Sequence, residues 1–257
     1  MIILKRWYYL VVIKSSKKVL IIIPTYNEKE NVERIVNAIL KIQTNLHILI
    51  VDDNSPDKTW QIAQRLSKKN NQVHFIRRDF KEGIGPAYMV GFNYALKNKF
   101  DYIFQMDGDF SHDPKMIPLM LAVAQFSDWV IGSRYVKGGN IKGWGARRKI
   151  ISWLGNFYTK LFLGFQIRDW TSGFSCWNAQ VLKKINLTSD ENPNGYAFQI
   201  AIKYKALLAG FKPSEIPIAF CDRKKGMTKM GGGIVNEAAL TVVRLRLMKK
   251  ELMKTFV

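Results

Sequence analysis

The chain has 257 residues, of which 47% are hydrophobic and 12% aromatic; this is enough to bury a full core and excludes a disordered chain. Its 40 lysines and arginines against 20 acidic residues give a formal charge of +20, which favours phosphorylated substrates, an anionic membrane surface or nucleic acid as partners. Cys176 and Cys221 match no zinc or redox spacing, so we expect ordinary buried thiols.

The first half of the chain alternates short β-branched runs with segments of helical periodicity. Such an alternation predicts an α/β fold, with a mostly parallel sheet and helices on both of its faces. Ligands of such sheets bind beyond the carboxyl ends of the strands. The predicted strands are 19–23, 47–51, 73–76, 102–106 and 129–132, and the predicted helices are 28–40, 58–66, 85–96 and 114–126.

The second half is less regular. A glycine-rich, basic loop at 138–145 is followed by a helix with an unusually aromatic face at 147–165. Downstream we predict a helix at 196–208, a strand at 216–220 and a basic amphipathic helix at 234–248.

These patterns divide the chain into three parts. We expect an N-terminal extension at 1–17, a main domain at 18–232 and a C-terminal basic amphipathic helix at 233–257. The longest apolar runs, 7–13 and 19–24, are far shorter than the roughly 20 residues of a spanning helix. We therefore expect a protein without a transmembrane helix, attached peripherally to a membrane if at all.

An acidic turn, Asp107-Gly108-Asp109, follows the predicted strand at 102–106. Two carboxylates one residue apart can both face a hard divalent cation such as Mg²⁺ or Mn²⁺. Such a cation could bridge the phosphates of a nucleotide-sugar and neutralise the departing diphosphate. The alternative is an Asp-Gly turn with solvated acids.

Other polar clusters also lie at strand ends. Asp52 and Asp53 end the second predicted strand, and Pro24 to Glu28 end the first. The glycines at 83–87 fail the dinucleotide pattern because Tyr88 stands at the third glycine position. With no P-loop pattern either, a Rossmann dehydrogenase and a P-loop kinase are disfavoured.

Three motifs, in this order, resemble the large inverting glycosyltransferase family with the GT-A fold: Ile-Pro-Thr-Tyr-Asn-Glu at 23–28, Val-Asp-Asp-Asn-Ser-Pro-Asp at 51–57 and the acidic turn at 107–109. Later blocks look like the dolichol- or polyprenol-phosphate mannose synthases, so that the resemblance covers roughly residues 18 to 248. These later blocks are 131–139, Asp169 with Ser172-Gly173-Phe174, 195–199, and Arg223 with Gly226, Thr228 and Lys229.

The resemblance implies transfer of mannose, with inversion, from GDP-mannose to a polyprenyl (dolichyl) phosphate. It also assigns roles to residues of this chain. Those implied to bind the nucleotide-sugar are Pro24, Tyr26, Glu28, Asp53, Asp107, Asp109, Arg223 and Lys229. Those implied to act in catalysis are Asp109, Arg134, Arg148, Arg223 and Lys229, with Arg134 and Arg148 on the acceptor phosphate.

The metal ligands implied are Asp107 and Asp109, with Ser111 as a third candidate. Many relatives carry a glutamine at the position of Ser111, and a hydroxyl is a poorer ligand. The lipid phosphate is already anionic at neutral pH, so the nucleophile needs no general base. We accordingly expect His112 to support the site by packing rather than to act as a base.

Several alternatives remain open at this point. The aromatic face of 147–165 fits either a membrane interface or the domain's own core, although a polyprenyl substrate favours the membrane. We expect the cytoplasmic face of a membrane, reached peripherally or through a small membrane-anchoring partner. A sister enzyme using UDP-glucose is the main alternative. A basic protein without catalysis is more distant, and dispersed charges without a recognition motif disfavour nucleic acid.

Overall fold

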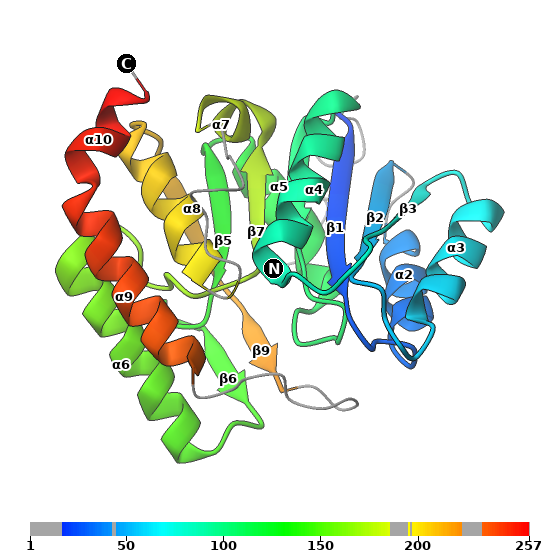
Figure 1. The fold of residues 1–257 in the computed structure, drawn as a ribbon, viewed down its shortest axis with the longest axis horizontal. Coiled ribbons are helices and arrows are strands. Elements are labelled where there is room, and N and C mark those ends of the chain that lie inside the picture. Colours follow the sequence, from blue (N-terminus) through cyan, green and yellow to red (C-terminus); the bar gives the residue numbers. More distant parts are fainter. Residues whose placement is uncertain (1–16, 43–44, 186–194, 196, 223–232, 257) are drawn as a thin grey trace, which may run out of the picture.

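The structure is a computed structural model that describes residues 17–42, 45–185, 195, 197–222 and 233–256. Seven strands form its main sheet in the order β3-β2-β1-β4-β7-β5-β8 (Figure 1). All run in one direction except β7, which is antiparallel to both β4 and β5. The strands are β1 (Val19–Thr25), β2 (Leu46–Asp52), β3 (Val73–Arg77), β4 (Tyr102–Gln105), β5 (Trp129–Ser133), β7 (Ser175–Asn178) and β8 (Pro213–Pro217).

Helices cover both faces of this sheet, because its central strands are apolar on both sides. Alternate residues of β1 enter two different cores, with Ile21 in one and Ile22 in the other. The core around Ile21 is closed by α2 (Val32–Leu40), α3 (Thr59–Lys69) and α5 (Ile117–Ala124), the last preceded by a short 3-10 turn (Pro114–Met116). The core around Ile22 is closed by α4 (Ile84–Lys97), α7 (Ala179–Lys184) and α8 (Ala197–Leu208).

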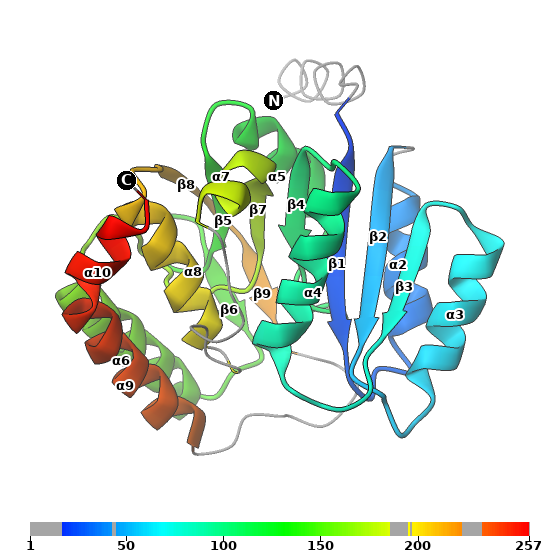
Figure 2. The same cartoon turned by 45° about the horizontal axis from the view of Figure 1, so that its top comes forward.

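A further helical layer lies beside α8, at one end of the sheet. It consists of α6 (Ala146–Leu163), α9 (Gly233–Leu247) and α10 (Lys249–Lys254), and α6 and α9 run side by side in both ribbon views (Figure 2). A small parallel sheet of β6 (Asn140–Lys142) and β9 (Ala219–Cys221) lies next to this layer. The carboxyl ends of the main strands, where we expect the ligands, face the same edge as this small sheet.

The predicted α/β architecture is confirmed, and the five strands of the first half match within two residues at each end. The predicted strand 216–220 is wrong, because two strands occupy it. The chain pairs with β5 up to Pro217 and then leaves the main sheet, since Asn140 donates from its backbone N–H to the carbonyl of Ile218 and β9 pairs with β6. The expected loop 138–145 therefore contains a strand.

Two helices also differ from expectation. The helix predicted from residue 28 begins at Val32, because Asn27 has a positive φ of 56° and Glu28 heads a tight turn that precedes the helix. The single C-terminal helix expected at 233–257 is two helices, broken at Met248 where ψ is 2°. This bend allows Leu252 of α10 to reach the same core as α4 and α8.

Candidate active site

The loops after β1 and β2 are tied together by Asp52, which is fully buried. Its carboxylate accepts hydrogen bonds from the Thr25 hydroxyl at 2.7 Å, from the Ser55 hydroxyl at 2.7 Å and from the Ser55 backbone N–H at 2.9 Å. All of these partners belong to the protein, so Asp52 builds the scaffold of the site. Its neighbour Asp53 is the acid that the resemblance assigns to the nucleotide.

Asp53 is held by a basic residue that the sequence does not single out. Arg78 Nη1 donates to Asp53 Oδ1 at 2.7 Å, and the Gly83 backbone N–H reaches the other carboxylate oxygen at 3.3 Å. Burial raises the pKa of Asp53, against the opposing effect of Arg78 and of the Gly83 N–H. Asp53 is thus fixed in orientation at the end of β2, with the start of α4 beside it.

The remaining nucleotide-site candidates lie at the end of β1 or just after it. Glu28 is buried, accepts from Asn31 Nδ2 at 2.9 Å and donates its backbone N–H to the Thr59 hydroxyl. Pro24 and Tyr26 are half-buried, and Lys81 Nζ lies 4.2 Å from the centroid of the Tyr26 ring. An aromatic ring and fixed backbone groups at this edge suit a planar base and a ribose.

The acidic turn after β4 is tightly packed and strained. A Cβ on Gly108 would lie 3.1 Å from Ile23 Cγ2, so the turn lies directly against the end of β1. Phe110 has a φ of 63°, a left-handed conformation that is unfavourable for a bulky residue. Asp109 stabilises this turn, because its Oδ1 accepts the Ser111 backbone N–H at 3.0 Å.

His112 holds the same turn in place from the protein interior. Its Nδ1 accepts the backbone N–H of Asp107 at 3.1 Å, and its ring stacks on Phe174 at 4.9 Å between centroids. The ring is 2% exposed, and burial lowers its pKa despite the nearby Asp107 and Asp109. A neutral imidazole whose Nδ1 is occupied orients Asp107, in agreement with the expected supporting role.

The turn offers a hard cation a suitable set of oxygen donors. Asp107 remains partly exposed, Asp109 lies two residues away, and the buried Ser111 Oγ has no hydrogen-bond partner among the described residues. Within the described ranges no group of three or more His, Cys, Asp or Glu side chains could hold a metal. Two carboxylates with one hydroxyl fit Mg²⁺ or Mn²⁺, which keep water and substrate phosphate oxygens as further ligands.

Arg134 follows β5 and forms a buried, bidentate ion pair with Asp169. Its Nε and Nη2 lie 2.8 and 2.7 Å from the two carboxylate oxygens, and Nη2 also donates to the Thr171 hydroxyl at 2.7 Å. The pair lowers the pKa of Asp169 and raises that of Arg134, although burial acts in the opposite direction on both. No described residue accepts a hydrogen bond from Arg134 Nη1, which leaves this nitrogen for a ligand.

The segment that carries Asp169 is fixed by Lys203 of α8. This fully buried lysine donates from Nζ to the carbonyls of Trp170 at 2.8 Å and Ser172 at 2.7 Å, with that of Asp169 at 3.4 Å. Lys203 therefore determines the position of Asp169, and through it that of Arg134. It lies on a helix whose sequence gives no hint of this role.

The protonation of Lys203 makes a prediction about stability. Burial lowers its pKa from 10.5 to about 7, against the attraction of Asp169. Between these values the unfolded chain binds the proton and the folded chain releases it, so the free energy of unfolding should rise with pH in that window. Urea titrations at pH 7 and pH 9 measure the rise, which we expect to be smaller in Lys203→Met. The exposed Lys212→Met is the control, and an undiminished rise in Lys203→Met would contradict the prediction.

Arg148 of α6 and Arg134 both lie against one aromatic ring, that of Trp144. Their guanidinium carbons lie 4.1 and 5.7 Å from the centroid of the Trp144 ring. Arg148 Nη1 also contacts both carboxylate oxygens of Asp222 at 3.1 Å. The structure thus brings together the two arginines that the resemblance assigns to one phosphate, and it adds Asp222 as a partner of Arg148.

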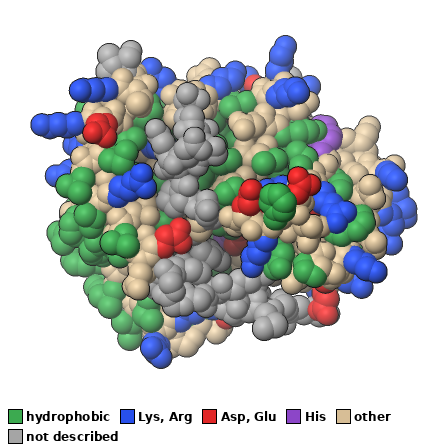
Figure 3. Space-filling model, in the orientation of Figure 1, with side chains coloured by type: hydrophobic (Ala, Val, Ile, Leu, Met, Phe, Trp, Pro, Cys, Tyr) green, Lys and Arg blue, Asp and Glu red, His purple; other side chains and the backbone are tan. Residues whose placement is uncertain are grey.

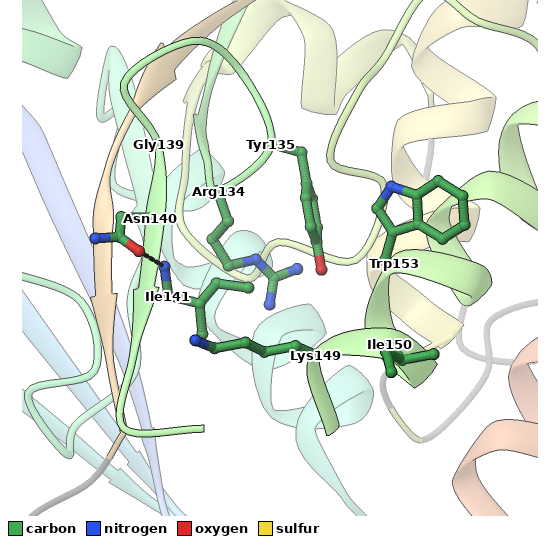
Figure 4. A pocket seen from close by; sticks show the side chains of 8 residues that line it. All are labelled: Arg134, Tyr135, Gly139, Asn140, Ile141, Lys149, Ile150 and Trp153. Atoms are coloured by element: carbon green, nitrogen blue, oxygen red, sulfur yellow. Dashed lines mark hydrogen bonds between the residues drawn. The ribbon is translucent and has the colours of Figure 1, made fainter. Parts of the chain in front are cut away.

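A pocket of about 360 Å³ opens in front of Arg134. Figure 4 shows the guanidinium group of Arg134 beside the Tyr135 ring, with Lys149 and Trp153 of α6 across the opening. The buried guanidinium group of Arg134 and the exposed Lys149 thus border the pocket together with the apolar side chains of Ile141, Ile150 and Trp153. This combination suits a phosphate that carries a hydrophobic tail.

Not every predicted site residue can be located. Arg223 and Lys229 lie outside the described residues. The functional partners that sequence reasoning missed are Arg78, Lys203 and Asp222, each recognisable only from the side chain that it contacts. Asp169 was noted as part of a motif, but its ion pair with Arg134 is a finding of the structure.

Comparison with known proteins identifies the family of this chain. The profile of glycosyl transferase family 2 matches residues 20–186. The polyprenol monophosphomannose synthase of Mycolicibacterium smegmatis is 39% identical over 232 residues, and the match covers 90% of this chain and 87% of that enzyme. The undecaprenyl-phosphate mannosyltransferase of Micrococcus luteus is 38% identical, and the match covers 88% of this chain and 93% of that enzyme. The dolichol-phosphate mannosyltransferase of Pyrococcus furiosus is 38% identical, and the match covers 89% of this chain and 63% of that enzyme.

Solved structures share the fold at low sequence identity. The glucosyl-3-phosphoglycerate synthase of Mycobacterium tuberculosis, in complex with Mn²⁺, UDP and glucosyl-3-phosphoglycerate, has a TM-score of 0.65 at 14% identity and covers 91% of this chain and 81% of its own. A mannosyltransferase of Pyrobaculum calidifontis, in complex with GDP-mannose and Mn²⁺, has a TM-score of 0.57 at 13% identity and covers 99% and 80%. The GT-A fold is thus confirmed. The chain is therefore a member of glycosyl transferase family 2 and a homologue of polyprenyl-phosphate mannosyltransferases.

Proposed function

We propose that the chain transfers mannose from GDP-mannose to a polyprenyl phosphate at the cytoplasmic face of a membrane, with inversion at the anomeric carbon. Identities of 38–39% to polyprenyl-phosphate mannosyltransferases over about nine-tenths of the chain support the acceptor and the sugar. The GDP-mannose bound by the Pyrobaculum enzyme supports the donor nucleotide.

One observation carries the proposal. Arg134 lines a pocket whose other wall is α6, and the same helix turns apolar side chains outward next to that pocket. A substrate with a phosphate at one end and a hydrocarbon chain at the other matches a charged pocket that lies next to an apolar surface. A free anionic metabolite would match only the charged pocket.

The residues of the chain then have distinct tasks. Pro24, Tyr26, Glu28 and Asp53 would hold the nucleotide at the ends of β1 and β2. Arg134 and Arg148 would hold the acceptor phosphate close to the donor, which offsets the repulsion between the two anionic groups. The nucleophile carries its own negative charge, so no side chain has to remove a proton from it.

The acidic turn would serve the leaving group. Asp107 and Asp109, with Ser111, would hold a divalent cation, Mg²⁺ or Mn²⁺, which supplies charge that neutralises the departing diphosphate. The Mn²⁺ bound by two structural neighbours supports this assignment. We assign Arg223 and Lys229 to the same diphosphate on the strength of the sequence resemblance alone.

The outer face of α6 supports attachment to a membrane surface. In this helix the polar Asn156 and Thr159 are buried, while Trp153 is 54% and Leu161 63% exposed, the reverse of an ordinary surface helix. Figure 3 shows hydrophobic side chains gathered over α6 and α9 on one side of the molecule. The exposed apolar residues here, called the apolar face below, are Ile150, Ile151, Trp153, Leu154, Phe157, Leu161, Leu240, Val243 and Leu247.

In the described part of the chain, no helix has the length and apolarity that a membrane span requires. Attachment would therefore use the apolar face with the arginines and lysines at the start of α6, where lipid headgroups lie. The predicted alternative that α6 packs its aromatics into the core applies only to Tyr158 and Phe162, which are partly buried against it.

Removing two aromatic side chains of the apolar face should weaken membrane binding. Trp153 and Phe157 stack at 5.6 Å between ring centroids and are both exposed. Full burial of such a side chain contributes roughly 1.5–3 kcal/mol, and only about half of each ring remains to be buried, so the double serine variant should bind vesicles of anionic phospholipid about 10- to 100-fold more weakly. Sedimentation with vesicles measures the loss. Phe126→Ser, at a residue 88% exposed after α5, is the matched control, and equal loss in both variants would contradict the role of the apolar face.

The function itself is tested by product formation. Purified protein is mixed with vesicles containing polyprenyl phosphate, Mg²⁺ or Mn²⁺, and either labelled GDP-mannose or labelled UDP-glucose. We expect an organic-soluble labelled lipid from GDP-mannose, from which mild acid releases labelled mannose. Label from UDP-glucose alone would refute the donor, and transfer to free phosphate but not to the lipid would refute the acceptor.

A further inference from the structure

Gln199, in the first turn of α8, is a buried polar residue without a role in the site described above. It is 1% exposed, and neither its Nε2 nor its Oε1 has a hydrogen-bond partner in the described part of the chain. Burying an amide without a partner costs free energy, so natural proteins rarely keep one without a reason. A ligand that supplies the missing partners is such a reason.

The amide lies next to the acidic turn. A Cβ placed on Gly173 would lie 3.8 Å from Gln199 Nε2, 3.8 Å from Asp107 Oδ1 and 3.6 Å from His112 Cε1. Two side chains of the loop after β4 and one of α8 therefore border one small space in front of Gly173. The backbone of Gly173 does not have a positive φ, so the absence of a side chain there matters for room rather than for conformation.

The other polar groups around this space already have partners. His112 Nδ1 accepts from the Asp107 backbone N–H, and Lys203, one helical turn after Gln199, donates to the carbonyls of the Asp169 segment. Asp107 is an anion that we assign to the metal and the diphosphate. Gln199 is thus the neutral donor and acceptor between the diphosphate side of the site and the segment that positions Arg134.

We propose that the side-chain amide of Gln199 binds hydroxyl groups of the hexose that is transferred. This inference rests on the proposed function, and it names the residue that recognises the sugar. Nε2 donates to one hydroxyl oxygen, and Oε1 accepts from a neighbouring hydroxyl, which an amide can do simultaneously. Because the amide is uncharged, it orients the hexose without competing for the metal or repelling the acceptor phosphate.

Gln199→Met tests the proposal, because methionine has a similar length and no amide. The protein without substrate should be as stable as the wild type or more so, since an unpaired buried amide is replaced by an apolar group. With GDP-mannose, kcat/KM should fall about 10- to 100-fold, the size expected when a buried hydroxyl loses its hydrogen-bond partner. The dissociation constant of GDP, measured by calorimetry, should stay within about twofold, because GDP has no hexose.

A mutant cycle with monodeoxy analogues of GDP-mannose identifies the contact. For the wild type, the analogue that lacks the contacted hydroxyl should be about 10- to 100-fold poorer than GDP-mannose, because the buried amide is then left without its partner. In Gln199→Met the same analogue should be as good as GDP-mannose. The proposal is overturned if every analogue loses the same factor in both proteins, or if affinity for GDP falls as much as kcat/KM.

These results separate the inference from the proposed function. If the wild type transfers mannose and the cycle shows no coupling, only the role of Gln199 is wrong. If the wild type uses another nucleotide-hexose, the proposed donor is wrong, and the same cycle with deoxy analogues of that hexose tests Gln199.

Discussion

Replacing Asp109 with alanine is expected to lower mannosyl transfer by at least about 10³-fold, the size of effect seen when a main stabiliser of transition-state charge is removed. Asp109 combines two tasks. It is one of the two carboxylates that we assign to the metal and the leaving diphosphate, and its Oδ1 accepts the Ser111 backbone N–H at 3.0 Å. Alanine removes both, so a loss of activity alone does not separate charge from turn geometry.

Asp109→Asn separates the two tasks. The amide oxygen can still accept the Ser111 N–H, so the strained turn at Phe110 is kept, while the negative charge is lost. We expect transfer to fall nearly as far as in Asp109→Ala, and binding of Mn²⁺ in the presence of GDP to weaken in calorimetry. Asp113 is an exposed acid that caps the 3-10 turn after the site. The control variant Asp113→Asn should keep both mannosyl transfer and Mn²⁺ binding. Normal turnover in Asp109→Asn would remove this carboxylate from the mechanism.

The parallel half of the fold was predictable because burial on both faces leaves a plain trace in sequence. Strands such as 19–23 and 47–51 are continuous apolar runs, and each is followed by a helix of clear periodicity. The second half gives no such signal. β7 has only four residues and pairs antiparallel between β4 and β5, and β6 exists only because β9 leaves the main sheet to meet it.

The candidate site likewise contains some features that local sequence predicts and others that depend on tertiary packing. Only Gly108 separates the acids Asp107 and Asp109 in sequence, so their shared turn could be inferred from the residues alone. The ion pair of Arg134 with Asp169 joins residues 35 positions apart, and Lys203 reaches the same segment from another helix. Contacts of this kind depend on the packing of β5, β7 and α8, which no local pattern encodes.

The outward direction of the α6 aromatics was likewise undetermined by sequence. A helix with apolar residues around much of its circumference fits a core or a membrane equally well. The structure decides which residues face out, because the buried side is fixed by Asn156, whose Oδ1 accepts the Trp170 backbone N–H at 2.8 Å. A polar anchor on the inner side turns Trp153 and Phe157 to the surface.

Arg134→Ala should cripple use of the acceptor and also weaken the fold. We assign Arg134 to charged hydrogen bonds with the lipid phosphate, so kcat/KM for polyprenyl phosphate should fall about 10²- to 10³-fold, with affinity for GDP unchanged within about twofold. The same change leaves Asp169 buried without its partner, which typically costs about 3–5 kcal/mol of folding free energy. Urea denaturation and acceptor kinetics in vesicles measure the two effects.

A second substitution separates the fold from the acceptor. In Arg134→Ala combined with Asp169→Asn no charge is left unpaired at residue 169, and the amide oxygen can still accept the Arg134 backbone N–H that now contacts Asp169 Oδ2. The free energy of unfolding should therefore recover in large part, whereas use of polyprenyl phosphate should stay as low as in the single variant. Recovery of both would mean that Arg134 acts only through stability. Parallel loss of GDP affinity would mean that it serves the donor, because a group that binds only the acceptor has no reason to affect the nucleotide.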